Sequence, residues 1–107
     1  MSTRNFTPVS QMVSYELDAG NSEQQNFTFS PSDTRPYTIQ TFGNLDTVMV
    51  LFEEKDNKQL QYLAGNDNSG TDKNASVAMK LFRGKKYVVK VRIYYKNPKE
   101  KTAIMIW

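Results

Sequence analysis

Short apolar segments separated by turn residues run through the whole chain, and they constrain its fold more than any other feature. Most of them alternate apolar and polar residues with a period of two, which is the pattern of a half-buried β-strand. They lie at residues 12–17, 26–29, 37–42, 48–52, 60–63, 75–81, 87–95 and 102–107. None shows the spacing of an amphipathic helix. The pattern predicts an all-β fold, and we expect an antiparallel eight-stranded β-sandwich of the jelly-roll type.

The length of the chain and its hydropathy predict a simple organisation. At 107 residues, the chain has the size of one domain. We expect a single β-sandwich over residues 12–107, preceded by a linker or disordered end over residues 1–11. No run of about 18 apolar residues is present, so the sequence predicts neither a membrane span nor a membrane partner. Residues 1–5 lack the apolar segment of a signal peptide.

The sequence contains no cysteine and no histidine. Without cysteine, the chain can form neither a disulfide nor a thiolate metal site. Without histidine, it lacks the commonest general base and cannot assemble a Ser-His-Asp or Cys-His site. The adjacent Glu53 and Glu54 cannot act together as acid and base, because neighbouring residues of a strand point to opposite faces. We therefore predict that the chain is not an enzyme and has no catalytic residues.

Positive charge is concentrated in the last part of the chain. Residues 1–78 hold 5 basic and 10 acidic side chains, whereas residues 79–107 hold 9 basic and 1 acidic. The net charges of the two parts are therefore −5 and +8. Such an asymmetry indicates either an anionic partner or the solvated edges of the late strands, where lysines deter strand-to-strand aggregation. The sequence leaves both interpretations open.

Three short motifs follow one another in a recognisable order. Leu45-Asp46-Thr47 precedes the apolar segment 48–52, Asn66-Asp67 opens a polar loop, and Gly84 precedes the strand Tyr87-Val88-Val89-Lys90-Val91. In this order the motifs resemble the bacterial pre-peptidase C-terminal domain family, over roughly half of the chain. The collagen-binding domains of clostridial collagenases are similar sandwiches.

The chain departs from the family pattern in three places. Asn68 stands where a second Asp is common, Arg83 replaces the usual Pro, and one additional residue separates Gly84 from Tyr87. The resemblance implies a non-catalytic jelly-roll domain that is appended to secreted proteases and other exported hydrolases. It further implies that the domain assists secretion, is removed during maturation or binds a polymer substrate.

Oxygen-bearing side chains lie in or beside two loops that the resemblance places near each other. Calcium is bound by six to eight oxygens from carboxylates, amides and carbonyls. The set therefore predicts a calcium site, and calcium is the one cofactor that the sequence indicates. The predicted ligands are Asp46, Asp67, Asn68 and Asp72. Alternatively, Asp46 caps a turn and residues 66–72 form an ordinary Asx-rich loop.

The segment at 87–95 offers the best candidate for a binding surface. If Tyr87 and Val89 face the core, then the alternate residues of this strand face solvent. A tyrosine beside cations suits stacking on a sugar ring or an aromatic partner, with the charges binding sulfate, carboxylate or phosphate. The residues predicted to bind ligand are Lys80, Lys90, Arg92 and Tyr94. The alternative is an amphipathic edge with extended lysines, and Tyr87 itself is predicted to lie in the core.

These observations favour a non-catalytic accessory domain of an exported bacterial hydrolase or surface protein. It would be secreted or displayed at the cell surface as part of a larger protein. Its expected partners are an extracellular polysaccharide or fibrous protein and the catalytic domain of the parent protein; the other expected role is to aid secretion or maturation. The competing hypothesis is a nucleic-acid-binding β-barrel that uses the basic C-terminal strands. The acidic first 78 residues and the excess of strands over the five of an OB-fold disfavour nucleic acid.

Overall fold

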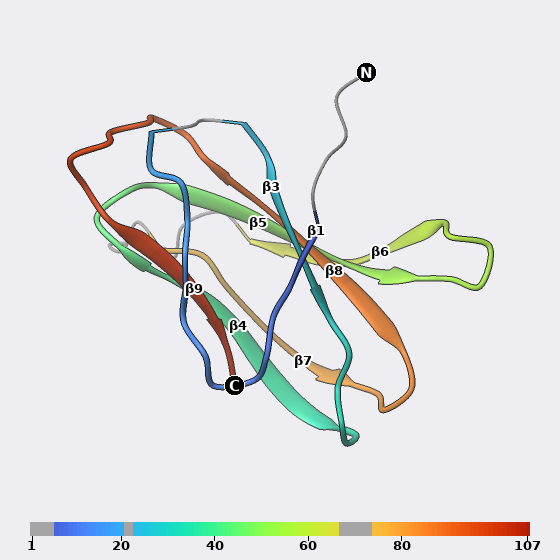
Figure 1. The fold of residues 1–107 in the computed structure, drawn as a ribbon. Coiled ribbons are helices and arrows are strands. Elements are labelled where there is room, and N and C mark those ends of the chain that lie inside the picture. Colours follow the sequence, from blue (N-terminus) through green and yellow to red (C-terminus); the bar gives the residue numbers. More distant parts are fainter. Residues whose placement is uncertain (1–5, 21–22, 67–73) are drawn as a thin grey trace.

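The computed structural model describes residues 6–20, 23–66 and 74–107. These residues form nine β-strands and no helix (Figure 1). The strands are β1 Phe6–Pro8, β2 Tyr15–Glu16, β3 Gln25–Phe29, β4 Arg35–Gly43, β5 Thr47–Glu54, β6 Leu60–Asn66, β7 Ser76–Leu81, β8 Lys86–Ile93 and β9 Thr102–Ile106. The described residues include no helix that is long and apolar enough to cross a membrane.

The strands form two sheets that pack face to face (Figure 1). The five-stranded sheet has the order β1-β3-β8-β5-β6, and the four-stranded sheet has the order β2-β9-β4-β7. Among the described strands, β5 and β6 are the only consecutive pair in one sheet. Every other connection takes the chain from one sheet to the other, as in a jelly roll. The all-β sandwich predicted from the sequence is confirmed.

The structure has nine strands where the sequence predicts eight. The additional strand is β1, which lies within residues 1–11, the segment expected to be irregular. Its pairing with β3 is parallel, with Phe6 opposite Asn26, whereas the other recorded strand pairs are antiparallel. All three residues of β1 are exposed, so the strand has no buried face and leaves no alternation in the sequence.

The strand predicted at residues 12–17 is shorter in the structure. Met12 has a φ of 67°, and the backbone N–H of Val13 donates to the carbonyl of Ser10 at 3.3 Å. The chain therefore turns at these residues. Strand β2 begins only at Tyr15, where the side chain packs against the core. The alternation of apolar residues is present before that point, but the backbone conformation is not extended there.

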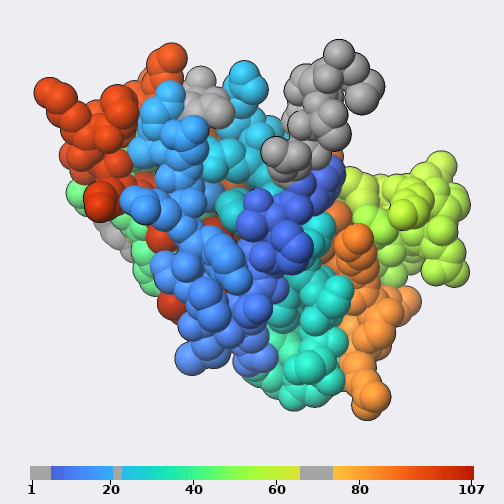
Figure 2. Space-filling view, viewed as in Figure 1, coloured from blue at the N-terminus to red at the C-terminus, as the bar shows by residue number. Residues whose placement is uncertain are grey.

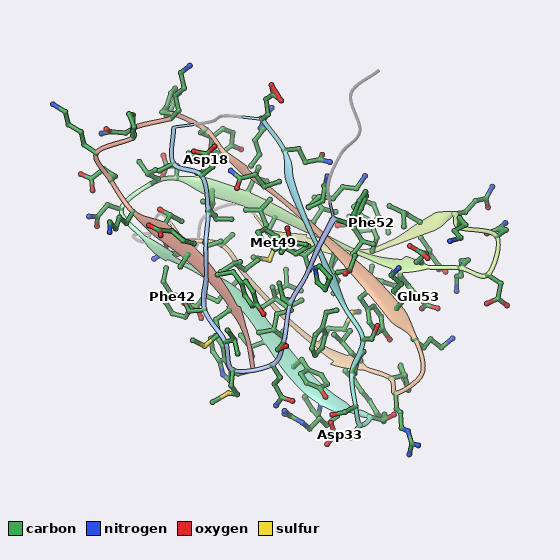
Figure 3. The ribbon with its side chains drawn as sticks, viewed as in Figure 1. Asp18, Asp33, Phe42, Met49, Phe52 and Glu53 are labelled. Carbon is green, nitrogen blue, oxygen red and sulfur yellow. The ribbon has the colours of Figure 1, made fainter. Side chains whose placement is uncertain are left out.

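The core lies between the two sheets and is built from their inward-facing residues. Met49 and Leu51 on β5 are fully buried, as are Val89 and Ile93 on β8. Ile39 of the four-stranded sheet is 1% exposed and covers them from the other side. Burying an aliphatic side chain of this size contributes about 1.5–3 kcal/mol. Figure 3 shows Met49 between the two sheets. On β8, the alternation in the sequence correctly identifies Val89 and Val91 as residues of the inner face.

Tyr87 combines core packing with a polar contact. Its side chain is 1% exposed, and its hydroxyl accepts a hydrogen bond from the backbone N–H of Phe82 at 2.9 Å. The ring therefore fills the core, while the hydroxyl provides a hydrogen-bond acceptor for a backbone N–H in the turn between β7 and β8. The predicted placement of Tyr87 in the core is confirmed.

Candidate ligand-binding surface

The outer face of the five-stranded sheet is built from rows of residues that oppose one another across the strands. Residues paired across neighbouring strands point to the same face of a sheet. Because Val89 and Val91 are buried in the core, their neighbours Lys90 and Arg92 point outward. Lys90 lies opposite Val50, and Arg92 lies opposite Val48. The next row pairs Val88 with Phe52 on β5, and Phe52 with Tyr62 on β6.

Aromatic rings and cations follow one another across this face. The rings of Tyr62 and Phe52 lie 6.3 Å apart at 83°, and the Lys90 ammonium lies 5.1 Å from the centre of the Phe52 ring. Arg92 is two residues along β8, and its guanidinium lies 5.6 Å from the ring of Tyr94. We call Tyr62, Phe52, Lys90, Arg92 and Tyr94 the aromatic–cation stripe. In Figure 3, Phe52 lies on the opposite side of the sandwich from Phe42 of the four-stranded sheet.

The stripe is open to solvent at its ends and shallow in the middle. Tyr62 is 62% exposed and Tyr94 is 38% exposed, whereas Phe52 and Lys90 are half-buried. A hollow of about 310 Å³ lies along the middle of the stripe. Its lining residues are Gln24, Val48, Val50, Phe52, Lys90, Val91 and Arg92. The surface is therefore an open, shallow hollow with a largely apolar floor between exposed tyrosine rings.

The two cations of the stripe lack carboxylate partners among the described residues. The recorded ion pairs involve other cations, and on this face Glu54 pairs with Lys86 at 3.8 Å. Lys90 and Arg92 instead rest against aromatic rings, which attract cations weakly through their quadrupole. Within the part of the chain that the structure describes, these two positive charges are therefore not neutralised by a carboxylate.

The structure brings together three of the four residues that the sequence predicts to bind ligand. Lys90, Arg92 and Tyr94 share one face, but Lys80 does not lie with them. Lys80 is on β7 in the four-stranded sheet, where its ammonium lies 5.5 Å from the Phe82 ring. Since its strand neighbours Met79 and Leu81 pack into the core, Lys80 points away from the sandwich on the other side. Lys80 therefore does not belong to the surface that the other three residues share, and its inclusion in one predicted site with them is corrected.

Sequence reasoning missed Phe52 and Tyr62. The segment 48–52 is apolar on both faces, which indicates a strand buried on both faces; in the structure its outer residues are only half-buried. Tyr62 belongs to β6, and its pairing with Phe52 follows a register shift between Leu51 and Phe52. The signal available in the sequence was Phe52 itself, a large aromatic residue on the outward side of an otherwise aliphatic strand.

Of the predicted calcium ligands, Asp46 is the one that the structure describes. It is half-buried in the turn before β5, and its carbonyl accepts a hydrogen bond from the backbone N–H of Tyr94 at 3.0 Å. Asp67, Asn68 and Asp72 lie outside the described residues. Within the described ranges, no group of three or more His, Cys, Asp or Glu side chains could hold a metal ion. Calcium therefore stays a prediction; Asp46, the described member of the predicted set, lies beside Tyr94 at one end of the stripe.

A second polar cluster lies at the base of the β5–β6 hairpin, which projects from the body of the molecule in Figure 2. The Glu53 carboxylate lies 3.2 Å from the ammonium groups of both Lys55 and Lys85. Burial raises the pKa of Glu53, but hydrogen bonds and charge attraction from the two lysines outweigh burial and hold it below its ordinary value. The carboxylate between two ammonium groups holds them together, so the cluster ties the hairpin to the β7–β8 turn.

Comparison with known proteins supports the fold. No family model and no curated protein sequence matches the chain. Among solved structures, the pre-peptidase C-terminal domain of a collagenase from Bacillus anthracis matches with a TM-score of 0.73 and 15% identity, over 100% of this chain and 99% of that one. The chain therefore has the fold of a pre-peptidase C-terminal domain, as its motifs predict.

Two further structures share the sandwich. CorA, a surface-associated copper-binding protein of Methylomicrobium album BG8, matches with a TM-score of 0.70 and 5% identity, over 95% of this chain and 96% of that one. PliG of Aeromonas hydrophila, a periplasmic inhibitor of g-type lysozyme, matches with a TM-score of 0.55 and 13% identity over the same shares. At these identities the likeness concerns the fold alone.

Proposed function

We propose that this chain is a non-catalytic binding domain that holds an extracellular polymer, a polysaccharide or a fibrous protein, on the outer face of its five-stranded sheet. The observation that carries the proposal is the aromatic–cation stripe. Its exposed rings can stack on the apolar faces of sugar or proline rings, and its cations can bind polar groups between them. Exposed rings at both ends of an open hollow suit a long polymer that extends beyond the hollow better than a small molecule, which prefers an enclosed site.

The setting of the domain is part of the same proposal. We infer that it accompanies the catalytic domain of a larger exported or surface protein. Support comes from the fold of the collagenase pre-peptidase C-terminal domain and from the surface-associated and periplasmic proteins that share the sandwich. The absence of histidine and cysteine from the sequence supports a role in binding rather than in catalysis. A role in secretion or maturation is the alternative within this setting.

A retention assay on insoluble polymers tests the proposal. Cellulose, chitin, xylan, peptidoglycan and fibrillar collagen are each incubated with the wild-type chain, with Tyr62→Ala and with Tyr94→Ala. We expect retention on at least one polymer and a loss of about tenfold for each variant, with unchanged thermal unfolding. The matched control is Phe82→Ala, which removes an exposed ring from the cation–aromatic pair on the opposite side of the sandwich. Equal retention of all four proteins overturns the assignment of the surface.

Nucleic acid is the second candidate ligand, because stacking rings beside cations also bind single strands. We rank it second because the stripe offers only two cations without an ion-pair partner among the described residues. Nucleic-acid sites neutralise several phosphates and lose affinity steeply with salt. If the chain bound single-stranded DNA tightly at 50 mM salt and lost most of that affinity by 200 mM, nucleic acid would become the leading candidate.

A further inference from the structure

We propose that the polymer is an anionic polysaccharide, with carboxylate or sulfate groups that Lys90 and Arg92 bind. This inference rests on the proposed function and names the ligand class of the same surface. It begins from the register between β5 and β8. Along these two strands, Glu54 faces Lys86, but Lys90 faces Val50 and Arg92 faces Val48. Lys86 is therefore paired with a carboxylate, whereas Lys90 and Arg92 face valines.

The environment of the two cations favours an anionic partner. Lys90 is half-buried, so part of its side chain lies on the apolar floor while its ammonium rests 5.1 Å from the Phe52 ring. The Arg92 guanidinium rests 5.6 Å from the Tyr94 ring. These ring contacts restrict the conformations of the ammonium and guanidinium groups without neutralising their charges. A cation that is partly desolvated and already oriented loses little conformational entropy when it binds an acid group.

The spacing of the cations suits a repeating ligand. Residues two apart on a strand point to the same face about 6.6 Å apart along the strand. A small monovalent acid could engage one of the two cations, whereas a polymer with repeated acid groups can engage both. The rings of Tyr62 and Tyr94 lie at the two ends of the cation pair. A polysaccharide can therefore place acid groups over the cations and sugar rings over the flanking tyrosines.

The floor of the surface favours sugar over nucleic acid or an acidic protein. The hollow is lined by Val48, Val50 and the amide of Gln24, whose Nε2 also donates to the side-chain Oδ1 of Asn26 at 2.8 Å. Sugar rings present apolar C–H faces and hydroxyl groups, which match an aliphatic floor with an amide at its rim. Two cations on an otherwise neutral face give too little positive charge for the many phosphates of a nucleic acid.

The test compares polymers that share a backbone and differ in charge. Polygalacturonate is paired with its methyl ester, and dextran sulfate with dextran; single-stranded DNA and polyglutamate serve as the other anionic polymers. Binding of the wild-type chain is measured by affinity electrophoresis and calorimetry. We expect at least tenfold tighter binding to one anionic polysaccharide than to its neutral partner. We also expect a shallow salt dependence, with a logarithmic slope no steeper than about 2.

Variants assign the effect to the two cations. The double variant Lys90→Gln/Arg92→Gln should lose at least tenfold in affinity for the anionic polysaccharide, and Lys90→Arg/Arg92→Lys should restore most of it. Lys80→Gln is the matched control, because Lys80 also lies beside an exposed ring but on the other sheet. It should bind as the wild type does. Thermal unfolding of each variant shows whether the fold is kept.

The outcomes separate this inference from the proposed function. Equal binding of charged and neutral polysaccharides, with a loss for Tyr62→Ala, overturns the anionic ligand but keeps the polymer-binding surface. Tighter binding of DNA or polyglutamate than of either anionic polysaccharide also overturns the inference, as does full binding by the double glutamine variant. No binding to any soluble or insoluble polymer overturns both.

Discussion

The hydroxyl oxygens of Thr41 and Thr47 lie 2.7 Å apart in the core and join the two sheets by a hydrogen bond. Thr41 is on β4 of the four-stranded sheet, and Thr47 begins β5 of the five-stranded sheet. Both side chains are fully buried. The backbone N–H of Ala75 donates to the Thr41 hydroxyl at 2.8 Å, so one side chain connects β4, β5 and the segment before β7.

Replacing Thr41 with valine should destabilise the fold. Valine keeps the volume and the β-branched shape but leaves the Thr47 hydroxyl and the Ala75 N–H without their partner in a buried site. An unsatisfied buried polar group costs about 1–3 kcal/mol. We expect a loss of about 2–3 kcal/mol in the free energy of unfolding, measured by urea titration. Thr38→Val, on the outer face of the same strand, should change stability by less than about 0.5 kcal/mol. Similar values for the two variants would contradict a structural role for the threonine pair.

Gly43 and Gly84 should respond differently to alanine. A Cβ at Gly43 would lie 2.7 Å from the Cα of Thr102 on the paired strand β9, so the backbone itself would have to move. Overpacking of this kind costs about 1–3 kcal/mol. Gly84 has a φ of 84° and nothing within 4 Å of the added carbon, so alanine there costs only about 1 kcal/mol of backbone strain. Chemical unfolding of both variants checks the order, and a larger loss at Gly84 would disprove it.

Glu53 should contribute stability that depends on pH. Because its folded pKa is below the ordinary value of 4.5, its stabilising effect is present above about pH 4.5 and is lost as the pH falls through the lowered pKa. Both lysine partners are substantially exposed, so solvent screening limits the effect to less than about 1 kcal/mol at pH 7. We expect Glu53→Gln to be less stable than wild type at pH 7, with the difference shrinking as the pH falls below 4.5. Glu16→Gln serves as the exposed control, and a difference that is constant with pH would refute the assignment.

The calcium hypothesis predicts a thermal shift. If Asp46 and the predicted loop ligands bind calcium, the ion stabilises the folded state by mass action and raises the melting temperature, and chelator reverses the rise. Asp67→Ala should abolish the rise, whereas Asp56→Ala in the β5–β6 hairpin should leave it unchanged. A rise that persists in Asp67→Ala would place the ion elsewhere. No rise in the wild type would contradict the calcium hypothesis.

The fold could be predicted from the sequence to a large extent because strand patterns are local. The segment at 87–95 shows in its own alternation that Val89 and Val91 face the core, and the structure buries both. The same alternation places Lys90 and Arg92 outside. Strand β1 could not be found in this way, because its exposed residues reflect pairing with β3 rather than burial.

The candidate surface was predictable only in part, because it spans three strands. Lys90 and Arg92 belong to one strand, so their common face follows from their spacing. Phe52 and Tyr62 reach the same face through the register of β5 and β6, which includes a shift that local sequence does not encode. Lys80 carries the same charge and stands at an outward position, but its strand belongs to the other sheet.

The sequence by itself determined most of the strands and, where apolar and polar residues alternate, which residues face inward, because both follow from a period of two between neighbours along the chain. The tertiary structure alone decided which strands share a sheet and in what register. That decision depends on hydrogen bonding and packing between residues far apart in the chain. It unites Tyr62, Phe52 and Lys90 in one surface and joins Thr41 to Thr47 across the core.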